Sequence, residues 1–102
     1  MPLNDAFAAL SDPTRREIVA RLVDGPQRAT DLSRCFPVSR PAVARHLRVL
    51  REAGIAEAVP KGRERIYRLT PHAFDEVKRW IDHHSRMWDE ALDSFVRKVE
   101  DQ

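Results

Sequence analysis

The stretch from Val38 to Gly54 constrains the fold more than any other part of the chain. Ser39 belongs to the residue types that cap the start of a helix, and Gly54 to those that end one in a left-handed conformation. Pro41, the proline between them, stands in the first turn, where proline is tolerated. The sequence therefore predicts a helix of about four turns here.

The two sides of this predicted helix differ in chemistry when successive residues are placed about 100° apart. The apolar side holds Val43, Leu47 and Leu50. The opposite side holds Pro41, Arg45, Arg48 and Glu52, with the small Ala44 among them. Arginines on an exposed face often serve only to solvate it. Separated by small residues, they also let a helix lie close to a grooved anionic surface such as the DNA major groove.

The charge distribution favours a polyanionic partner. The chain of 102 residues carries a formal net charge of only +2. Between Arg40 and Arg68, however, eight Lys and Arg residues stand against three Glu, which makes a basic segment in an otherwise acidic chain. Such a segment is typical of a nucleic-acid-binding surface.

Three shorter helices are expected before this stretch. Leu3, Phe7 and Leu10 share one face of the first, and Asp12 with Pro13 caps and starts the second. Thr30 and Asp31 start the third, which Pro37 ends shortly before Ser39. Two helices joined by so tight a turn, the second with a basic face, form a helix-turn-helix.

After Gly54 the pattern changes to that of a β-hairpin. Residues 55–59 alternate loosely, Lys61-Gly62-Arg63 supplies a turn, and residues 65–69 alternate again, with Ile66 or Tyr67 and Leu69 as anchors. This hairpin carries Lys61, Arg63, Arg65 and Arg68. Elsewhere it would be an ordinary basic hairpin, but directly after a helix-turn-helix it is expected to be a wing that reaches DNA beside the groove.

The last predicted helix begins at Thr70-Pro71 and meets no breaker before Gln102. Its apolar stripe comprises Phe74, Val77, Ile81, His84, Trp88, Leu92, Phe95 and Val99, with Trp80 and Ala91 at the edge. Such a helix is about 45 Å long, far beyond the radius of gyration of about 13 Å of a compact chain of this size. One protomer cannot cover the stripe, so we expect a symmetric homodimer. The expected interface residues are Leu3, Phe7, Leu10, Trp80, Ile81, His84, Trp88, Leu92 and Phe95.

Three groups of residues match a known pattern. They are Ala9–Arg16 before the second helix, Ser39–Leu47 with Leu50 and Glu52–Gly54 in the basic helix, and Gly62-Arg63 with Tyr67–Leu69 in the wing. Together they resemble the ArsR/SmtB family of winged-helix repressors over nearly the whole chain. The expected fold is mainly α, one winged helix-turn-helix domain over residues 1–102, with about five helices and a two-stranded wing.

The resemblance implies a dimeric repressor that binds an inverted repeat in double-stranded DNA and releases it when an effector binds. Base contacts would come from Ser39, Arg40, Ala44 and Arg45, with Pro41 on the same surface. Phosphate contacts would come from Arg48, Lys61, Arg63 and Arg65. His46, near the apolar side of its helix, is expected to pack or form a hydrogen bond rather than to read a base.

The ligands of the family's metal sites are incomplete here. Members that sense metals or arsenite often use paired cysteines in the third helix, where this chain has only Cys35. A second family site needs histidines from both last helices; Asp82-His83-His84 resembles one half, and no histidine follows His84. We therefore expect no metal and no cofactor, with His84 as an interface histidine. Cys35 is expected to be a buried small hydrophobe beside Leu32 and Phe36, with a mixed disulfide or adduct as the alternative.

Other functions fit the sequence less well. It contains no glycine-rich phosphate loop, no paired catalytic carboxylates and no Ser-His-Asp arrangement, so an enzyme is not expected. A winged-helix module that binds an acidic protein, or a metal- or thiol-responsive sensor of the same fold, remains the alternative. The single cysteine, the lack of an apolar run of about 18 residues and the lack of a signal-peptide core predict a cytoplasmic protein.

Overall fold

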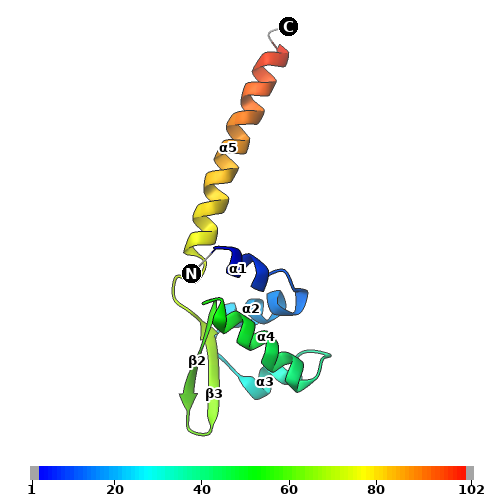
Figure 1. Cartoon of the computed structure of the whole chain (residues 1–102), viewed down its shortest axis with the longest axis vertical. Helices are drawn as coiled ribbons and strands as arrows, with labels where there is room; N and C mark the ends of the chain where they lie inside the picture. Colours follow the sequence, from blue (N-terminus) through cyan, green and yellow to red (C-terminus); the bar gives the residue numbers. More distant parts are fainter. Residues whose placement is uncertain (1–2, 101–102) are drawn as a thin grey trace.

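The computed structural model describes residues 3–100 as five helices and a three-stranded sheet (Figure 1). In chain order the elements are α1 (Leu3–Ala9), α2 (Pro13–Asp24), β1 (Gln27–Arg28), α3 (Ala29–Arg34), α4 (Arg40–Glu52), β2 (Ala56–Lys61), β3 (Glu64–Leu69) and α5 (Asp75–Glu100). Helices α1 to α4 and the sheet gather into one body, from which α5 projects as a rod. The expected mainly helical winged helix-turn-helix fold is confirmed.

The hydrophobic core lies where α2, α3 and α4 meet the sheet. Its largest fully buried side chains are Ile18, Leu32, Val43, Leu50 and Ile55. Leu47 is 2% exposed, so all three residues expected on the apolar side of α4 are buried. Burial of this side leaves the basic side of α4 turned outward.

The two helix starts predicted from capping residues are confirmed. Asp12 caps α2, where its Oδ1 accepts the backbone N–H of Arg15 at 3.1 Å and Pro13 begins the helix. Ser39 caps α4, where its Oγ accepts the backbone N–H of Ala42 at 3.2 Å. Both bonds satisfy amide groups that have no partner within the first turn of a helix.

Helix α4 ends in a Schellman motif around Gly54, whose φ of 76° is in the left-handed region. The N–H of Gly54 donates to the carbonyl of Arg51 at 3.0 Å, and the N–H of Ile55 donates to the carbonyl of Leu50 at 2.9 Å. Leu50 and Ile55 are both fully buried, so the helix end is fixed to the core. Strand β2 begins at the next residue, Ala56.

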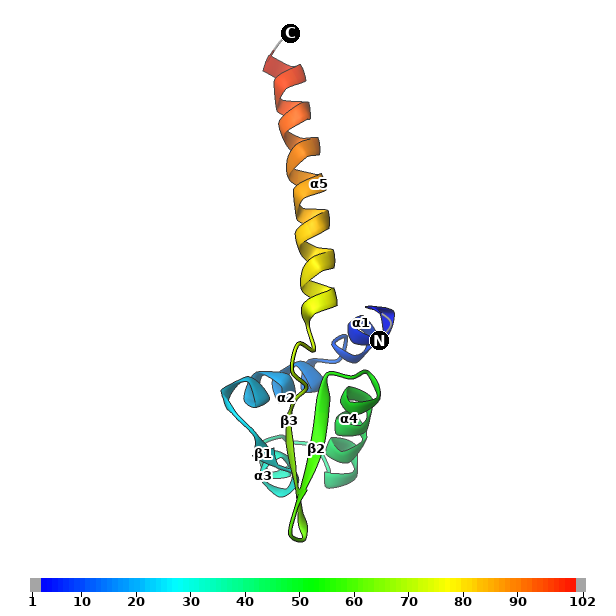
Figure 2. The same ribbon diagram turned by 90° about the vertical axis from the view of Figure 1, so that its left-hand side faces the viewer.

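The wing consists of β2 and β3, which pair antiparallel from Ala56 opposite Leu69 to Lys61 opposite Glu64. Gly62 and Arg63 form a two-residue turn, and a positive φ of 63° at Gly62, its first central position, is typical of a type II′ turn. Figure 2 shows the wing extending away from α5.

The sheet has one strand more than the sequence predicted. Strand β1 pairs with β3, with Gln27 opposite Tyr67 and Arg28 opposite Ile66, and gives the strand order β1-β3-β2. Two polar residues are too short a segment for alternation to reveal a strand, so only the pairing with β3 defines it.

Helix α5 begins later than predicted, at Asp75 rather than at Pro71. His72 has a φ of 60°. The segment from Thr70 to Phe74 forms a turn, in which the N–H of Ala73 donates to the carbonyl oxygen of Thr70 and the N–H of Asp75 donates to the carbonyl oxygen of His72. The left-handed residue breaks the helical path that Pro71 would allow. The helix is described to Glu100, and the predicted end at Gln102 lies outside the described residues.

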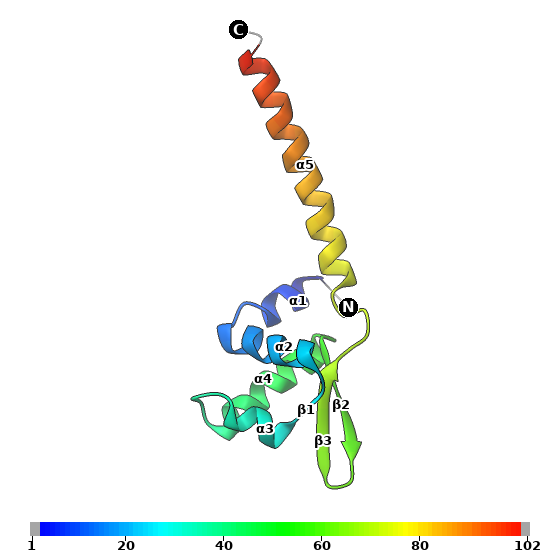
Figure 3. The same cartoon turned by 180° about the vertical axis from the view of Figure 1, so that it is seen from behind.

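The molecule measures 69 × 26 × 22 Å along its principal axes because α5 leaves the body after its first turns (Figure 3). At the base of α5, Val77 is buried and Phe74 is half-buried against the core. None of the helices in residues 3–100 is both long enough and apolar enough to cross a membrane.

Candidate nucleic-acid interface

The outward side of α4 carries the residues expected to meet DNA. Arg40, Pro41, Ala44, Arg45 and Arg48 are all exposed. Ser39 is exposed as well, and because its Oγ accepts the cap hydrogen bond, its hydroxyl hydrogen is still able to donate. These six side chains therefore form one surface from the helix start to its third turn.

The wing cations divide between the two faces of the hairpin, because side chains alternate along a strand. Arg68 pairs with Glu57 across the hairpin, Nε to Oε1 at 2.6 Å, and Arg28 of β1 pairs with Glu64, Nε to Oε2 at 3.2 Å. Lys61 stands opposite Glu64 in the register and so shares their face.

Arg65 lies on the other face of the hairpin, in alternation with the buried Tyr67 that packs on the body. Arg63 lies in the turn between the strands. Seen from behind, α3 and α4 lie on one side of the hairpin (Figure 3), and Tyr67 in the core places Arg65 on that side. The basic tip of the wing and the basic side of α4 therefore belong to one surface.

Six of the cations expected to contact DNA have no ionic partner within residues 3–100. No carboxylate of that range lies within 4.0 Å of Arg40, Arg45, Arg48, Lys61, Arg63 or Arg65. A polyanion that binds them has no internal ion pair to break. By contrast, Arg68, which the sequence placed on the basic wing, is already neutralised by Glu57.

Sequence reasoning did not single out Arg51 as part of this surface. Arg48 and Arg51 line a hollow of about 400 Å³ between the second half of α4 and strand β2, together with Glu52, Ala56, Glu57 and Ala58. The three-residue spacing of the two arginines would have indicated a shared helix side, but the position of β2 beside it comes only from the tertiary structure.

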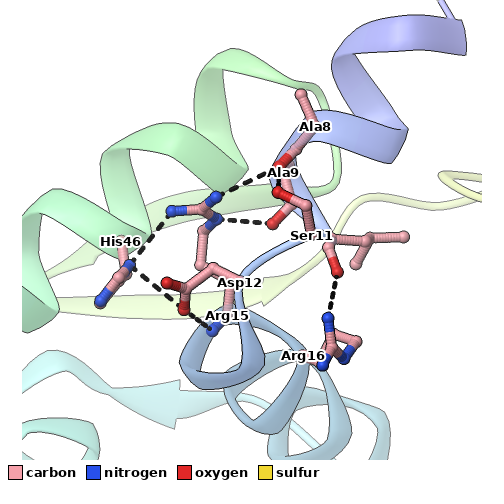
Figure 4. Close-up of polar contacts among 8 residues, drawn as sticks. Ala8, Ala9, Ser11, Asp12, Arg15, Arg16 and His46 are labelled. Atoms are coloured by element: carbon pink, nitrogen blue, oxygen red, sulfur yellow. Dashed lines mark hydrogen bonds and ion pairs between the residues drawn. The ribbon is translucent and has the colours of Figure 1, made fainter.

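His46 makes the hydrogen bond that was expected of it, and its partner comes from α2. Its Nδ1 lies 3.3 Å from Nη1 of Arg15 and 4.0 Å from Oδ1 of Asp12 (Figure 4). The pKa of Asp12 is lowered, chiefly because its carboxylate accepts the backbone N–H of Arg15; partial burial opposes this, and the backbone N–H of Thr14 and the charge of Arg15 add to the lowering.

The residues expected at a dimer interface divide into two groups. In α5, Trp88, Phe95, Leu92 and Ile81 are exposed by 68%, 64%, 56% and 48%. Leu3 and Leu10 instead pack partly against the core of their own protomer. On α5, the exposed large apolar side chains outside the expected interface set are Met87, Val96 and Val99.

An aromatic cluster joins α1 to the base of α5. The rings of Phe7 and Trp80 meet edge to face with centroids 5.3 Å apart, and those of Trp80 and His84 stack at 4.0 Å. Nδ1 of His84 lies 2.9 Å from the carbonyl oxygen of Trp80 and therefore donates to it. Three of the expected interface residues thus lie side by side.

Cys35 is exposed, which corrects the expectation of a buried thiol. Helix α3 ends at Arg34, one residue earlier, and the Sγ of Cys35 points back to the carbonyl oxygen of Asp31 at 3.1 Å. Phe36 is half-buried against the core, and the guanidinium of Arg21 lies over its ring. Among the described residues, no three His, Cys, Asp or Glu side chains gather as metal ligands would.

The chain is similar to one family model, to two relatives and to one solved structure. A family model described as a helix-turn-helix domain matches residues 10–59. The chain is 39% identical to the HTH-type transcriptional regulator Rv2034 of Mycobacterium tuberculosis, over 95% of this chain and 88% of that protein. It is 33% identical to the transcriptional repressor SdpR of Bacillus subtilis, over 78% of this chain and 88% of that protein. The solved structure of an ArsR-like transcriptional regulator from Rhodococcus sp. RHA1 matches with a TM-score of 0.78 and 39% identity, over 91% of this chain and 88% of that chain.

Proposed function

The chain belongs to the ArsR/SmtB family of DNA-binding transcriptional repressors, and we propose that it acts as a homodimer that binds an inverted repeat in double-stranded DNA and represses its own or a neighbouring operon. The relatives are named as transcriptional regulators rather than enzymes, and we propose no catalytic activity. We expect the protein to act in the cytoplasm.

In the proposed complex, α4 enters the major groove. Ser39, Arg40, Ala44 and Arg45 meet base edges, with the flat Pro41 beside them, while Arg48, Lys61, Arg63 and Arg65 meet phosphates. The observation that carries the proposal is the row of six cations without an ionic partner among the described residues, next to wing cations that are already paired. Unpaired cations on a helix and an adjoining hairpin fit the outline of a duplex groove and its flanking backbone.

The homodimer is supported by the apolar stripe of α5. Exposed Trp88, Leu92 and Phe95 on a helix without a covering element would form a large apolar patch, which a soluble protein normally buries in an interface. Two copies related by a two-fold axis would present two α4 helices to successive turns of a duplex.

The proposal is tested by incubating the purified full chain with genomic DNA fragments and sequencing those retained at moderate salt. We expect a few sites with an inverted repeat, whose half-sites are about one helical turn apart. Four phosphate-contacting cations in each protomer predict a slope of roughly −7 for log affinity against log salt concentration. Retention without sequence preference, or retention only of acidic proteins added in competition, would contradict the proposal.

A further inference from the structure

Arg15 joins two helices that are far apart in the sequence. From the first turn of α2, its Nε donates to the carbonyl oxygen of Ala9 at 2.5 Å and its Nη2 to that of Ala8 at 3.1 Å. Its Nη1 reaches Nδ1 of His46 in the middle of α4 at 3.3 Å (Figure 4). One guanidinium group therefore holds the carboxyl end of α1 and the side of α4 at the same time.

The chemistry of this contact defines the state of the imidazole. A guanidinium group donates hydrogen bonds and accepts none, so Nδ1 of His46 accepts and the ring hydrogen is on Nε2. The side chain of His46 is only 17% exposed. The charged groups that face it are Arg15 at 3.3 Å and Asp12 at 4.0 Å. Protonation at Nδ1 would remove the acceptor for Arg15 and favour Asp12 instead.

The contact lies between the two functional parts of the molecule. His46 follows Arg45, the proposed base-reading residue, directly in α4. At the other end, α1 carries Phe7, which packs on Trp80 at the base of α5. Trp80, the helix α1 that carries Phe7, Arg15 and His46 thus form a continuous series that connects the proposed dimerisation helix with the proposed recognition helix.

We propose that Arg15 and His46 are positioning residues that set the orientation of α4 about its own axis and couple it to α1 and α5. Sequence-specific binding then depends on this hydrogen bond, whereas general attraction to phosphates does not. The proposal rests on the proposed function for its DNA readout, but the coupling of α1 to α4 is a property of the free protein.

The chain offers a matched control in Arg16. Its Nη1 donates to the carbonyl oxygen of Leu10 at 2.8 Å, so it also stabilises the end of α1. Among the described residues, its hydrogen bonds do not reach α4. A purely structural role of Arg15 at the end of α1 would make Arg15→Gln and Arg16→Gln equivalent.

The first experiment needs no DNA. Amide hydrogen exchange of the full chain is compared among wild type, Arg15→Gln and Arg16→Gln, with circular dichroism to establish that each is folded. We expect Arg15→Gln to speed exchange both at the end of α1 and in residues 44–48, and Arg16→Gln to speed it only in α1. Equal effects of the two variants on α4 would overturn the coupling, whether or not the protein binds DNA.

The second experiment measures the ratio of affinity for the retained fragment to affinity for an unrelated duplex. We expect Arg15→Gln and His46→Leu each to lower this ratio about tenfold, with the salt slope unchanged. The double variant is expected to be no worse than either single one, because both remove the same bond. His46→Asn, which keeps an acceptor near the position of Nδ1, is expected to restore most of the ratio.

Rescue by His46→Asn is the readout that a merely structural role would not give. Additive effects of the two single variants, or a ratio in His46→Asn as low as in His46→Leu, would overturn the proposal. Binding of wild type without any sequence preference would instead contradict the proposed function, and hydrogen exchange would still decide the coupling.

Discussion

Nε of Arg68 lies 2.6 Å from Oε1 of Glu57, its cross-strand partner, on the face of the wing that points away from the body. Both side chains are exposed enough that the pair contributes little to stability. Its effect is on charge: Arg68 is neutralised, whereas Arg65, on the opposite face, has no carboxylate within 4.0 Å among the described residues. The ion pair thus leaves Lys61 as the wing cation of the outer face that has no ionic partner among the described residues.

We expect Arg65→Ala to weaken binding to any duplex and to reduce the magnitude of the salt slope by about 0.9 for each protomer, because one phosphate contact is lost. Arg68→Ala, the matched variant on the outer face, should leave both quantities nearly unchanged. Fluorescence anisotropy titrations at four or five salt concentrations measure the two slopes. Equal losses in the two variants would show that Arg68 contacts DNA despite its ion pair with Glu57.

Arg45→Ala should weaken binding to the retained fragment by about 1 to 3 kcal/mol and should also relax sequence preference, because a base contact is lost. Arg63→Ala should weaken binding to all sequences alike. The measurement is a gel-shift titration of each variant on the retained fragment and on single-base variants of it. If neither substitution changes the affinity, the assignment of α4 to the groove is wrong.

Gly54→Ala should destabilise the fold by about 1 kcal/mol, because alanine is disfavoured at a φ of 76°. Ile55→Ala removes a fully buried side chain next to it and should cost about 2 to 5 kcal/mol. Chemical denaturation gives both values. Val59→Ala, at a position 37% exposed on the outer face of the wing, serves as the control and should cost far less.

Trp88→Glu should convert the proposed dimer to a monomer, since a carboxylate would have to be buried in the interface formed by α5. Val23→Glu changes a side chain of similar exposure, 66% against 68%, on α2 and away from the stripe. Sedimentation equilibrium measures the mass of both variants, and circular dichroism should show unchanged helix content. A wild type that sediments as a single chain when concentrated would contradict the proposed dimer.

Asp12→Asn should alter the pH dependence of stability. The pKa of Asp12 is lower in the folded chain than in the unfolded chain, mainly because its carboxylate accepts the N–H of Arg15. The free energy of unfolding of wild type is therefore expected to exceed that of Asp12→Asn at neutral pH. This extra stability should disappear as the pH falls from the ordinary pKa of aspartate through the lowered pKa of Asp12 in the folded chain. Thermal unfolding of both proteins from pH 7 to pH 2.5 measures the difference; Asn keeps the cap hydrogen bond, so only the charge is tested.

Features set by neighbours in the sequence were predicted correctly. Asp12, Ser39 and Gly54 act through bonds to residues three to five positions away, so the local sequence was sufficient to place two helix starts and one helix end. The alternation of residues 55–59 and 65–69 likewise placed the wing, whose strands are observed at residues 56–61 and 64–69.

Features that depend on distant contacts were not predicted. Strand β1 exists because β3 pairs with it, and the contact between Arg15 and His46 joins residues 31 positions apart. Pro71 suited a helix start, yet the left-handed His72 delays α5 to Asp75. The burial expected for Cys35 failed because α3 ends at Arg34 and turns the thiol outward.

The Schellman motif at Gly54 joins α4 to the wing through only three residues, Ala53 to Ile55. Because Ile55 is fixed in the core and β2 starts at Ala56, α4 and the hairpin are expected to shift as one rigid body. An inducer would then not change the conformation of α4 or of the hairpin independently of the other. Release of the operator would instead come from a change in the separation or tilt between the two such bodies of a dimer, which measurement of the distance between labelled wing tips would detect.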